Sequence, residues 1–218
     1  SVEAVTKARV EELATSLERW LWGALDDDGR LTYKYWPSRG EESRANNMIR
    51  QWMGSLALAR AAHRSRDPAL VARVRQNIAY NLDKYYVENG GLGGIRWRNR
   101  IKLGAVAIAA MAIREFDTDA DQRMRVALGA LESTVLHLWD EDGSFRTFLE
   151  PAGLRGQQNF YPGEALCLWA RGFSETRDDA ILRRIMRSFE FYRQWHLDPR
   201  NRNPAFVPWH TQAYARVW

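Results

Sequence analysis

The chain has 218 residues, of which 45% are hydrophobic and 27% charged, so it can bury a core without disulfides or structural metals. Its formal net charge of +5 mildly favours an anionic partner, but the absence of a run of five or six basic residues argues against nucleic acid. The single cysteine, Cys167, excludes an internal disulfide framework, and no apolar run reaches the roughly 18 residues of a membrane span.

Apolar residues recur every three to four positions along most of the chain, which predicts α-helices. In chain order, the expected helices span residues 4–25, 44–64, 69–87, 102–116, 119–139, 162–173, 178–196 and 208–218. The first places Val5, Leu13, Leu17 and Trp20 on one face, as in an amphipathic helix with one buried side. Residues 102–116 are apolar on nearly every side, which predicts a fully buried helix.

Four similar segments punctuate these helices. Each is a turn rich in glycine or charged residues followed by a short aromatic stretch, and they begin at Asp26, Asn89, Asp140 and Asp198. A period of roughly 50–60 residues is typical of a repeat architecture, in which the connecting loops gather on one rim and carry binding residues. The stretches Leu31–Trp36 and Phe145–Leu149 are candidates for short hairpin-like segments on that rim.

The helices alternate between an amphipathic type and a smaller, more apolar type. This alternation predicts two concentric layers, with the amphipathic helices outside and the helices rich in glycine and alanine inside. No βαβ pattern and no long alternating strand is present. We therefore expect an all-α fold that forms a single domain over residues 1–218.

This layout resembles the α/α toroid, the barrel of helical hairpins found in six-hairpin glycosidases and N-acylglucosamine 2-epimerase-like proteins. The segments that carry the resemblance are Asn159–Leu166 and Phe206–Ala213. It implies a carbohydrate-active enzyme with its site at the inner-helix ends. Such toroids commonly have more hairpins than the roughly three and a half to four found here. The ring is therefore expected to be open, or to be completed by a further segment of a longer protein or by another copy of the chain.

Two residues are candidates for acid–base chemistry. Glu164 is a carboxylate in an otherwise apolar inner helix, where burial would raise its pKa towards that of a general acid. The alternative is a first-turn glutamate that the helix dipole stabilises. His210 is the second candidate, because histidines act as acids or bases in the epimerases that the layout resembles. The alternative is a histidine with a structural hydrogen bond at a helix start.

Nine further residues are candidates for substrate binding through hydrogen bonds, charge or aromatic stacking. They are Asn47, Arg50, Gln51, Trp97, Arg98, Lys102, Tyr161, Trp209 and Gln212. The alternative for each is an ordinary role in a helix cap, a surface loop or the packed hub. His63, His137 and His196 are expected to face outward. The acidic runs Asp26–Asp28 and Asp140–Asp142 are expected to form turns rather than metal sites.

Two functions follow from these residues. The first is an enzyme acting on a polysaccharide or oligosaccharide, with an acidic glycan as one candidate substrate; hydrolysis, lyase chemistry and epimerisation all stay open. The second is a non-catalytic helical scaffold that binds a glycan or a protein. No phosphate-binding loop, dinucleotide fingerprint or nucleophile elbow is present, so no cofactor and no metal are expected. The first residues lack a signal-peptide pattern, which slightly favours the cytoplasm, although a mature chain would have lost such a segment.

Overall fold

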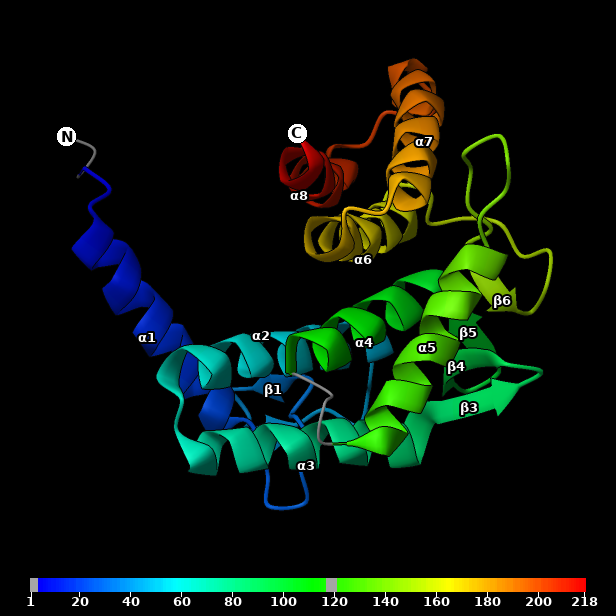
Figure 1. Cartoon of the computed structure of the whole chain (residues 1–218). Coiled ribbons are helices and arrows are strands. Elements are labelled where there is room, and N and C mark those ends of the chain that lie inside the picture. Colours follow the sequence, from blue (N-terminus) through cyan, green and yellow to red (C-terminus); the bar gives the residue numbers. More distant parts are fainter. Residues whose placement is uncertain (1–3, 117–120) are drawn as a thin grey trace.

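The computed structural model describes residues 4–116 and 121–218, which form eight α-helices, one short 3₁₀-helix and six short strands (Figure 1). The helices are α1 (Lys7–Gly23), α2 (Met48–Ser65), α3 (Pro68–Tyr85), α4 (Leu103–Phe116), α5 (Gln122–His137), α6 (Tyr161–Thr176), α7 (Asp179–Leu197) and α8 (Val207–Val217), with η1 (Pro204–Phe206) before α8. The prediction of a largely helical chain is confirmed. The first two residues of the helix expected at 119–139 lie outside the described residues.

Short polar side chains start most of the helices. Asn47, Asp67, Asp121 and Asp178 each accept a hydrogen bond from a backbone N–H group in the first turn of the helix that follows. These bonds satisfy donors that have no partner within the helix. The helix α4 has no such cap because strand β5 runs directly into it, and its first N–H group, on Leu103, donates to the carbonyl of Thr147 at 3.0 Å.

The helices form two layers. In the inner layer α2 packs against α4, α4 against α6, and α6 against α8, while α3, α5 and α7 each pack on the inner helix next to them in sequence. Glycines allow this close approach: a Cβ atom on Gly104 in α4 would lie 2.7 Å from Tyr161 Cδ1 in α6. A Cβ atom on Gly163 in α6 would lie 2.6 Å from Trp209 Cβ in α8. The helices α1 and α8 lie at the two ends of this stack (Figure 1).

The helix α4 forms the centre of the core. All its residues from Leu103 to Ile113 are buried, as its uniformly apolar sequence predicts. Small residues dominate this stretch, so neighbouring helices can lie close on several sides at once.

The all-α prediction holds only in part, because the chain also contains two small antiparallel sheets. The strands β3 (Tyr86–Asn89), β4 (Leu92–Trp97), β5 (Arg100–Lys102) and β6 (Phe148–Glu150) form an antiparallel sheet in that order, and β1 (Tyr35–Trp36) pairs with β2 (Glu41–Glu42). Gly90 and Gly91, with φ of 58° and 76°, form the two-residue turn between β3 and β4. Two adjacent residues with positive φ match the twist of a tight β-hairpin, which is why this glycine pair can connect two antiparallel strands.

The first and third repeat segments share one turn geometry. The N–H groups of Asp26 and Asp140 donate to the carbonyls of Arg30 and Ser144, each at 3.0 Å. Gly29 and Gly143 have φ of 91° and 96°, and each lies against the backbone of an outer helix, α3 and α7 respectively. The carboxylates take part in these turns: Asp26 Oδ1 accepts from Arg30 N, and Asp142 Oδ1 from Ser144 N. The second and fourth segments differ, because they form the sheet and the helix η1.

The helix α1 departs from the expected packing. It contains no buried residue, and Leu13, Leu17 and Trp20 are exposed, as is Val5 just before it. Its main contact is α2, at one end of the inner layer, so its apolar face is not covered as the sequence suggested. In residues 4–116 and 121–218, no helix combines the length and apolar composition needed to cross a bilayer.

Candidate functional site

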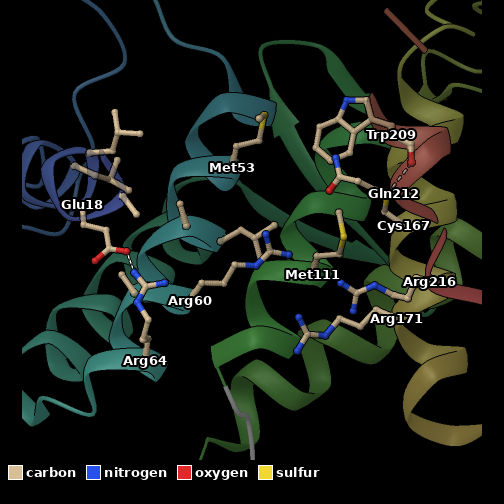
Figure 2. A pocket seen from close by; sticks show the side chains of 16 residues that line it. Glu18, Met53, Arg60, Arg64, Met111, Cys167, Arg171, Trp209, Gln212 and Arg216 are labelled. Carbon is tan, nitrogen blue, oxygen red and sulfur yellow. Dashed lines mark hydrogen bonds and ion pairs between the residues drawn. The ribbon is translucent and has the colours of Figure 1, made fainter. Parts of the chain in front are cut away.

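A cavity of about 460 Å³ lies on the inner face of the helical stack, between α1, α2, α4, α6 and α8 (Figure 2). Much of its wall is apolar, with Leu17 and Leu21 from α1, Met53 and Leu56 from α2, and Met111 from α4. Its volume is in the range typical of small-ligand sites, roughly 300–1,000 Å³. We call it the arginine cavity, because its charged lining consists of Arg60, Arg64, Arg171 and Arg216 with one carboxylate, Glu18.

Helical spacing directs these side chains to one place. On α8, Trp209, Gln212 and Arg216 are three and four residues apart, which puts them on one face; on α6, Cys167 and Arg171 are four residues apart. The arginines lie toward the C-terminal ends of their helices, where the helix dipole favours positive charge. The sequence pattern did not indicate these four arginines, because the resemblance to a toroid places binding residues at the starts of the inner helices.

Three of the four guanidinium groups have acidic partners. Arg64 pairs with Glu18 of α1, which joins α1 to α2 across the cavity edge (Figure 2). Arg60 Nε lies 3.3 Å from Glu115 Oε2, and Arg171 contacts the same carboxylate. Arg171 Nε also lies 3.0 Å from an oxygen of Glu175.

Arg216 is different. Within the described part of the chain its guanidinium group makes no hydrogen bond and no ion pair. A guanidinium group can bind a carboxylate or phosphate through two parallel hydrogen bonds. Among the described residues, the cavity lining therefore carries an excess of positive charge, and the Arg216 guanidinium group is free to bind an anion.

Two of the residues predicted to bind substrate, Trp209 and Gln212, line the arginine cavity. Gln212 Nε2 donates to the carbonyl of Pro208 at 2.9 Å. Cys167, which also lines the cavity, donates its thiol hydrogen to the carbonyl of Trp209 at 3.2 Å. Burial raises the pKa of the Cys167 thiol to about 12, so the sulfur stays protonated and is a poor nucleophile.

Glu164 lies outside the cavity lining, one helical turn before Cys167 on α6. The residue is only 3% exposed, and its buried Oε2 has no hydrogen-bond partner among the residues that the structure describes. Burial raises the pKa of this carboxyl group to about 8, although the positive charge of Lys102 acts in the opposite direction. The group is therefore largely protonated at neutral pH, which is the state that a general acid requires.

His210 is also buried, at the start of α8. Its Nδ1 lies 3.1 Å from the hydroxyl of Tyr214, and its Nε2 has no hydrogen-bond partner in the described ranges of the chain. Burial, followed by the neighbouring His196, lowers the pKa of His210 to about 3. The imidazole is therefore neutral near pH 7.

The prediction that His196 faces outward is wrong, whereas His63 and His137 are exposed as expected. His196 stacks on Phe206, with ring centroids 3.6 Å apart, and its ring meets that of His210 at 5.3 Å. It is buried because it continues the stripe of Ser188 and Tyr192 on the inward face of α7.

The polar start of α2 serves the local structure. Asn47 caps the helix, and Gln51 is buried with its Nε2 donating to the carbonyl of Leu31 at 2.9 Å. Arg50 is exposed and donates to the hydroxyl of Tyr33 at 3.1 Å. None of these three residues lines the arginine cavity.

The remaining candidates lie on the sheet and at the start of α6. Trp97 meets Tyr85 edge to face at 5.7 Å, and Arg98 is exposed at the turn between β4 and β5. Lys102 is half-buried, and desolvation lowers the pKa of its ammonium group. Tyr161 packs against Phe148 in the core. Glu164, His210 and Arg50, expected to meet in one pocket, thus lie in three different environments.

In the residues that the structure describes, no three His, Cys, Asp or Glu side chains are arranged to hold a metal ion. No protein-family model matches the chain, and no curated protein matches it.

Proposed function

We propose that this chain is a carbohydrate-active protein that binds an acidic saccharide in the arginine cavity, on the inner face of an incomplete α/α toroid. The observation that supports this most is the convergence of Arg60, Arg64, Arg171 and Arg216 on one cavity, where Arg216 has no partner among residues 4–116 and 121–218. Charge-assisted hydrogen bonds to a carboxylate or sulfate group would satisfy that guanidinium group.

The other walls suit a sugar ring. The indole of Trp209 and the apolar side chains offer flat and aliphatic surface for the C–H faces of a pyranose, and the amide of Gln212 lies beside them on α8 (Figure 2). The cavity volume suits a mono- or disaccharide unit rather than a long segment of chain.

The toroid is proposed from the packing order. Consecutive inner helices lie side by side, and the starts of α4 and α6, and of α6 and α8, meet at glycines. A segment of a longer protein or a second copy of the chain would complete the ring. The uncovered apolar face of α1 supports such an addition.

A second candidate function is catalysis, with Glu164 as the general acid. The support is the pKa of about 8, which keeps the carboxyl group protonated at neutral pH. The charge of Lys102 acts on this group, whereas His210, with a pKa lowered to about 3, is too weak a base to support the base role expected for it. Hydrolysis by paired carboxylates needs a second carboxyl group about 5–10 Å away, so lyase chemistry and epimerisation stay open beside it.

Titration calorimetry with glucuronate- and galacturonate-containing disaccharides, and with their neutral counterparts, tests the binding site. We expect the acidic sugars to bind more tightly than the neutral ones, and we expect Arg216→Gln to weaken the binding of the acidic sugars roughly tenfold or more. The matched control is Arg98→Gln, which removes an exposed arginine outside the cavity and should leave affinity unchanged.

Equal affinity for acidic and neutral sugars, or wild-type affinity in Arg216→Gln, would contradict the proposal. A fatty acid that binds more tightly than any saccharide would reassign the cavity to an amphipathic anion. For the catalytic candidate, Glu164→Gln should abolish turnover of any acidic oligosaccharide that the wild type converts while leaving its binding intact.

A further inference from the structure

Two hollows adjoin on the surface of α7, away from the arginine cavity. One has a volume of about 270 Å³ and the other about 470 Å³. Asp142, Phe191 and Trp195 line both hollows, so the two are neighbours, and we call them together the α7 groove. The α7 groove shares no lining residue with the arginine cavity.

An aromatic platform lies in the middle of this groove. The rings of Phe191 and Trp195, one helical turn apart on α7, stack with centroids 6.2 Å apart and planes inclined by 20°. Both side chains are half-buried, so each presents part of its surface to the groove. Parallel aromatic faces of this kind suit flat or aliphatic ligand surfaces.

Polar groups surround the platform. The amides of Gln194, Gln157 and Asn159 line the groove. Within the described part of the chain, two buried atoms of lining residues, Asn159 Oδ1 and Trp195 Nε1, have no hydrogen-bond partner. A buried acceptor and a buried donor without partners are unfavourable for the protein alone.

The loop that carries Gln157 and Asn159 is held in place by hydrogen bonds of Gln158, which lies between them. Gln158 Nε2 donates to the carbonyl of Phe145 at 3.0 Å, and the hydroxyl of Tyr192 donates to Gln158 Oε1 at 2.7 Å. The polar wall of the groove is therefore anchored to the core, and a ligand would not have to order it on binding.

The charges lining the groove balance. Three carboxylates and three guanidinium groups line it, namely Asp140, Asp142, Glu190, Arg146, Arg155 and Arg187. Asp140 pairs with Arg146, Glu190 pairs with Arg193, and Arg187 Nε donates to the carbonyl of Glu141. A groove without net charge does not select an anion or a cation, in contrast to the arginine cavity.

From these observations we infer that the α7 groove binds a neutral oligosaccharide. The C–H faces of sugar rings pack on Phe191 and Trp195, and their hydroxyl groups, which both donate and accept, bond to the amides and carboxylates on either side. The inference is independent of the proposed function, because the two sites have no residue in common and each can fail alone.

Calorimetry of the full chain with cellohexaose, maltohexaose and mannohexaose tests this inference. We expect at least one of these neutral hexasaccharides to bind, with an affinity that is the same in low and high salt. Phe191→Leu should weaken that binding roughly tenfold, because a flat ring is lost from the platform. The matched control is Phe189→Leu on the same helix, since Phe189 packs on Tyr214 outside the groove.

Gln194→Ala is a second variant. Gln194 is exposed, so the substitution does not threaten folding, and it should also lower the affinity for the hexasaccharide. Arg216→Gln should leave binding of the neutral sugar unchanged, which separates this site from the arginine cavity. Failure of all three hexasaccharides to bind would overturn the inference. Binding that Phe191→Leu and Gln194→Ala both leave intact, or a groove that takes only charged sugars or peptides, would overturn it as well.

Discussion

Gly104 in α4 leaves the space that the carboxyl group of Glu164 occupies at the start of α6. A Cβ atom on Gly104 would overlap Glu164 Oε2 and lie 3.0 Å from Glu164 Cδ. The missing side chain and the buried carboxyl group therefore form one packing unit between two inner helices.

Replacement of Gly104 by alanine should destabilise the protein, because the added methyl group has to displace the Glu164 carboxyl group. We expect a loss of about 1–3 kcal/mol in the free energy of unfolding, measured by urea denaturation. Gly129→Ala is the control: nothing lies within 4 Å of its Cβ position, so alanine in the middle of α5 should stabilise slightly. If the double variant Gly104→Ala/Glu164→Ala shows no relief relative to the sum of the single changes, the two residues are not coupled in this way.

The buried Glu164 should make stability fall as pH rises through neutrality. Its pKa is raised from 4.5 to about 8, so between these values the folded protein holds a proton that the unfolded chain has released. Stability from this group is fully present below pH 4.5 and is lost as pH approaches 8, with a slope of up to about 1.4 kcal/mol per pH unit. In urea denaturation of Glu164→Gln over the same pH range, the free energy of unfolding should no longer fall with this slope. An unchanged slope would mean that the Glu164 carboxyl group is not protonated in the folded protein.

His210 should produce the opposite dependence at acidic pH. Its pKa falls from 6.5 to about 3, so stability is fully present above pH 6.5 and is lost as pH drops towards 3. His196, whose pKa burial also lowers, acts in the same direction. Thermal denaturation of His210→Phe should show a shallower loss of stability at acidic pH, whereas His137→Gln, at an exposed position, should behave as the wild type does.

Glu18 competes with any anion in the arginine cavity, because its carboxylate pairs with Arg64. Glu18→Gln should therefore tighten the binding of an acidic disaccharide several-fold, and the effect should shrink at high salt. Glu12→Gln on the same helix, where Glu12 pairs only with the exposed Arg9 and lies outside the cavity lining, should change nothing. Weaker binding in Glu18→Gln would mean that Glu18 holds the ligand or the cavity wall in place.

Much of the helical framework could be predicted from apolar spacing alone. The expected starts of α3 and α7 lie within a residue of the observed ones, because short polar caps mark them. The hairpin at Gly90 and Gly91 was missed although the glycine pair was visible, since neighbouring glycines were interpreted as part of a repeated turn. The uncovered face of α1 was beyond prediction, because periodicity shows that a face is apolar but not whether another element covers it.

The candidate site, like the fold, could be predicted from the sequence only in part. The burial of Glu164 followed from its place in an otherwise apolar helix, and the structure agrees. The convergence of Arg60, Arg171 and Arg216 did not, because arginines near helix ends are common and the sequence does not show which of them face a shared cavity. The loop beside Trp195 is likewise placed by long-range hydrogen bonds, from Gln158 to Phe145 and Tyr192, that local sequence does not reveal.

The helix α1 contains no buried side chain, although it forms one wall of the arginine cavity. The helix α1 is held in place by far less apolar contact than α4 and α6. It should therefore separate from the cavity locally, well before the whole protein unfolds. Hydrogen exchange at the amides of α1 should accordingly be much faster than in α4. If the arginine cavity binds a saccharide as proposed, local separation of α1 would admit a ligand larger than the resting volume, while the other helices stay in place.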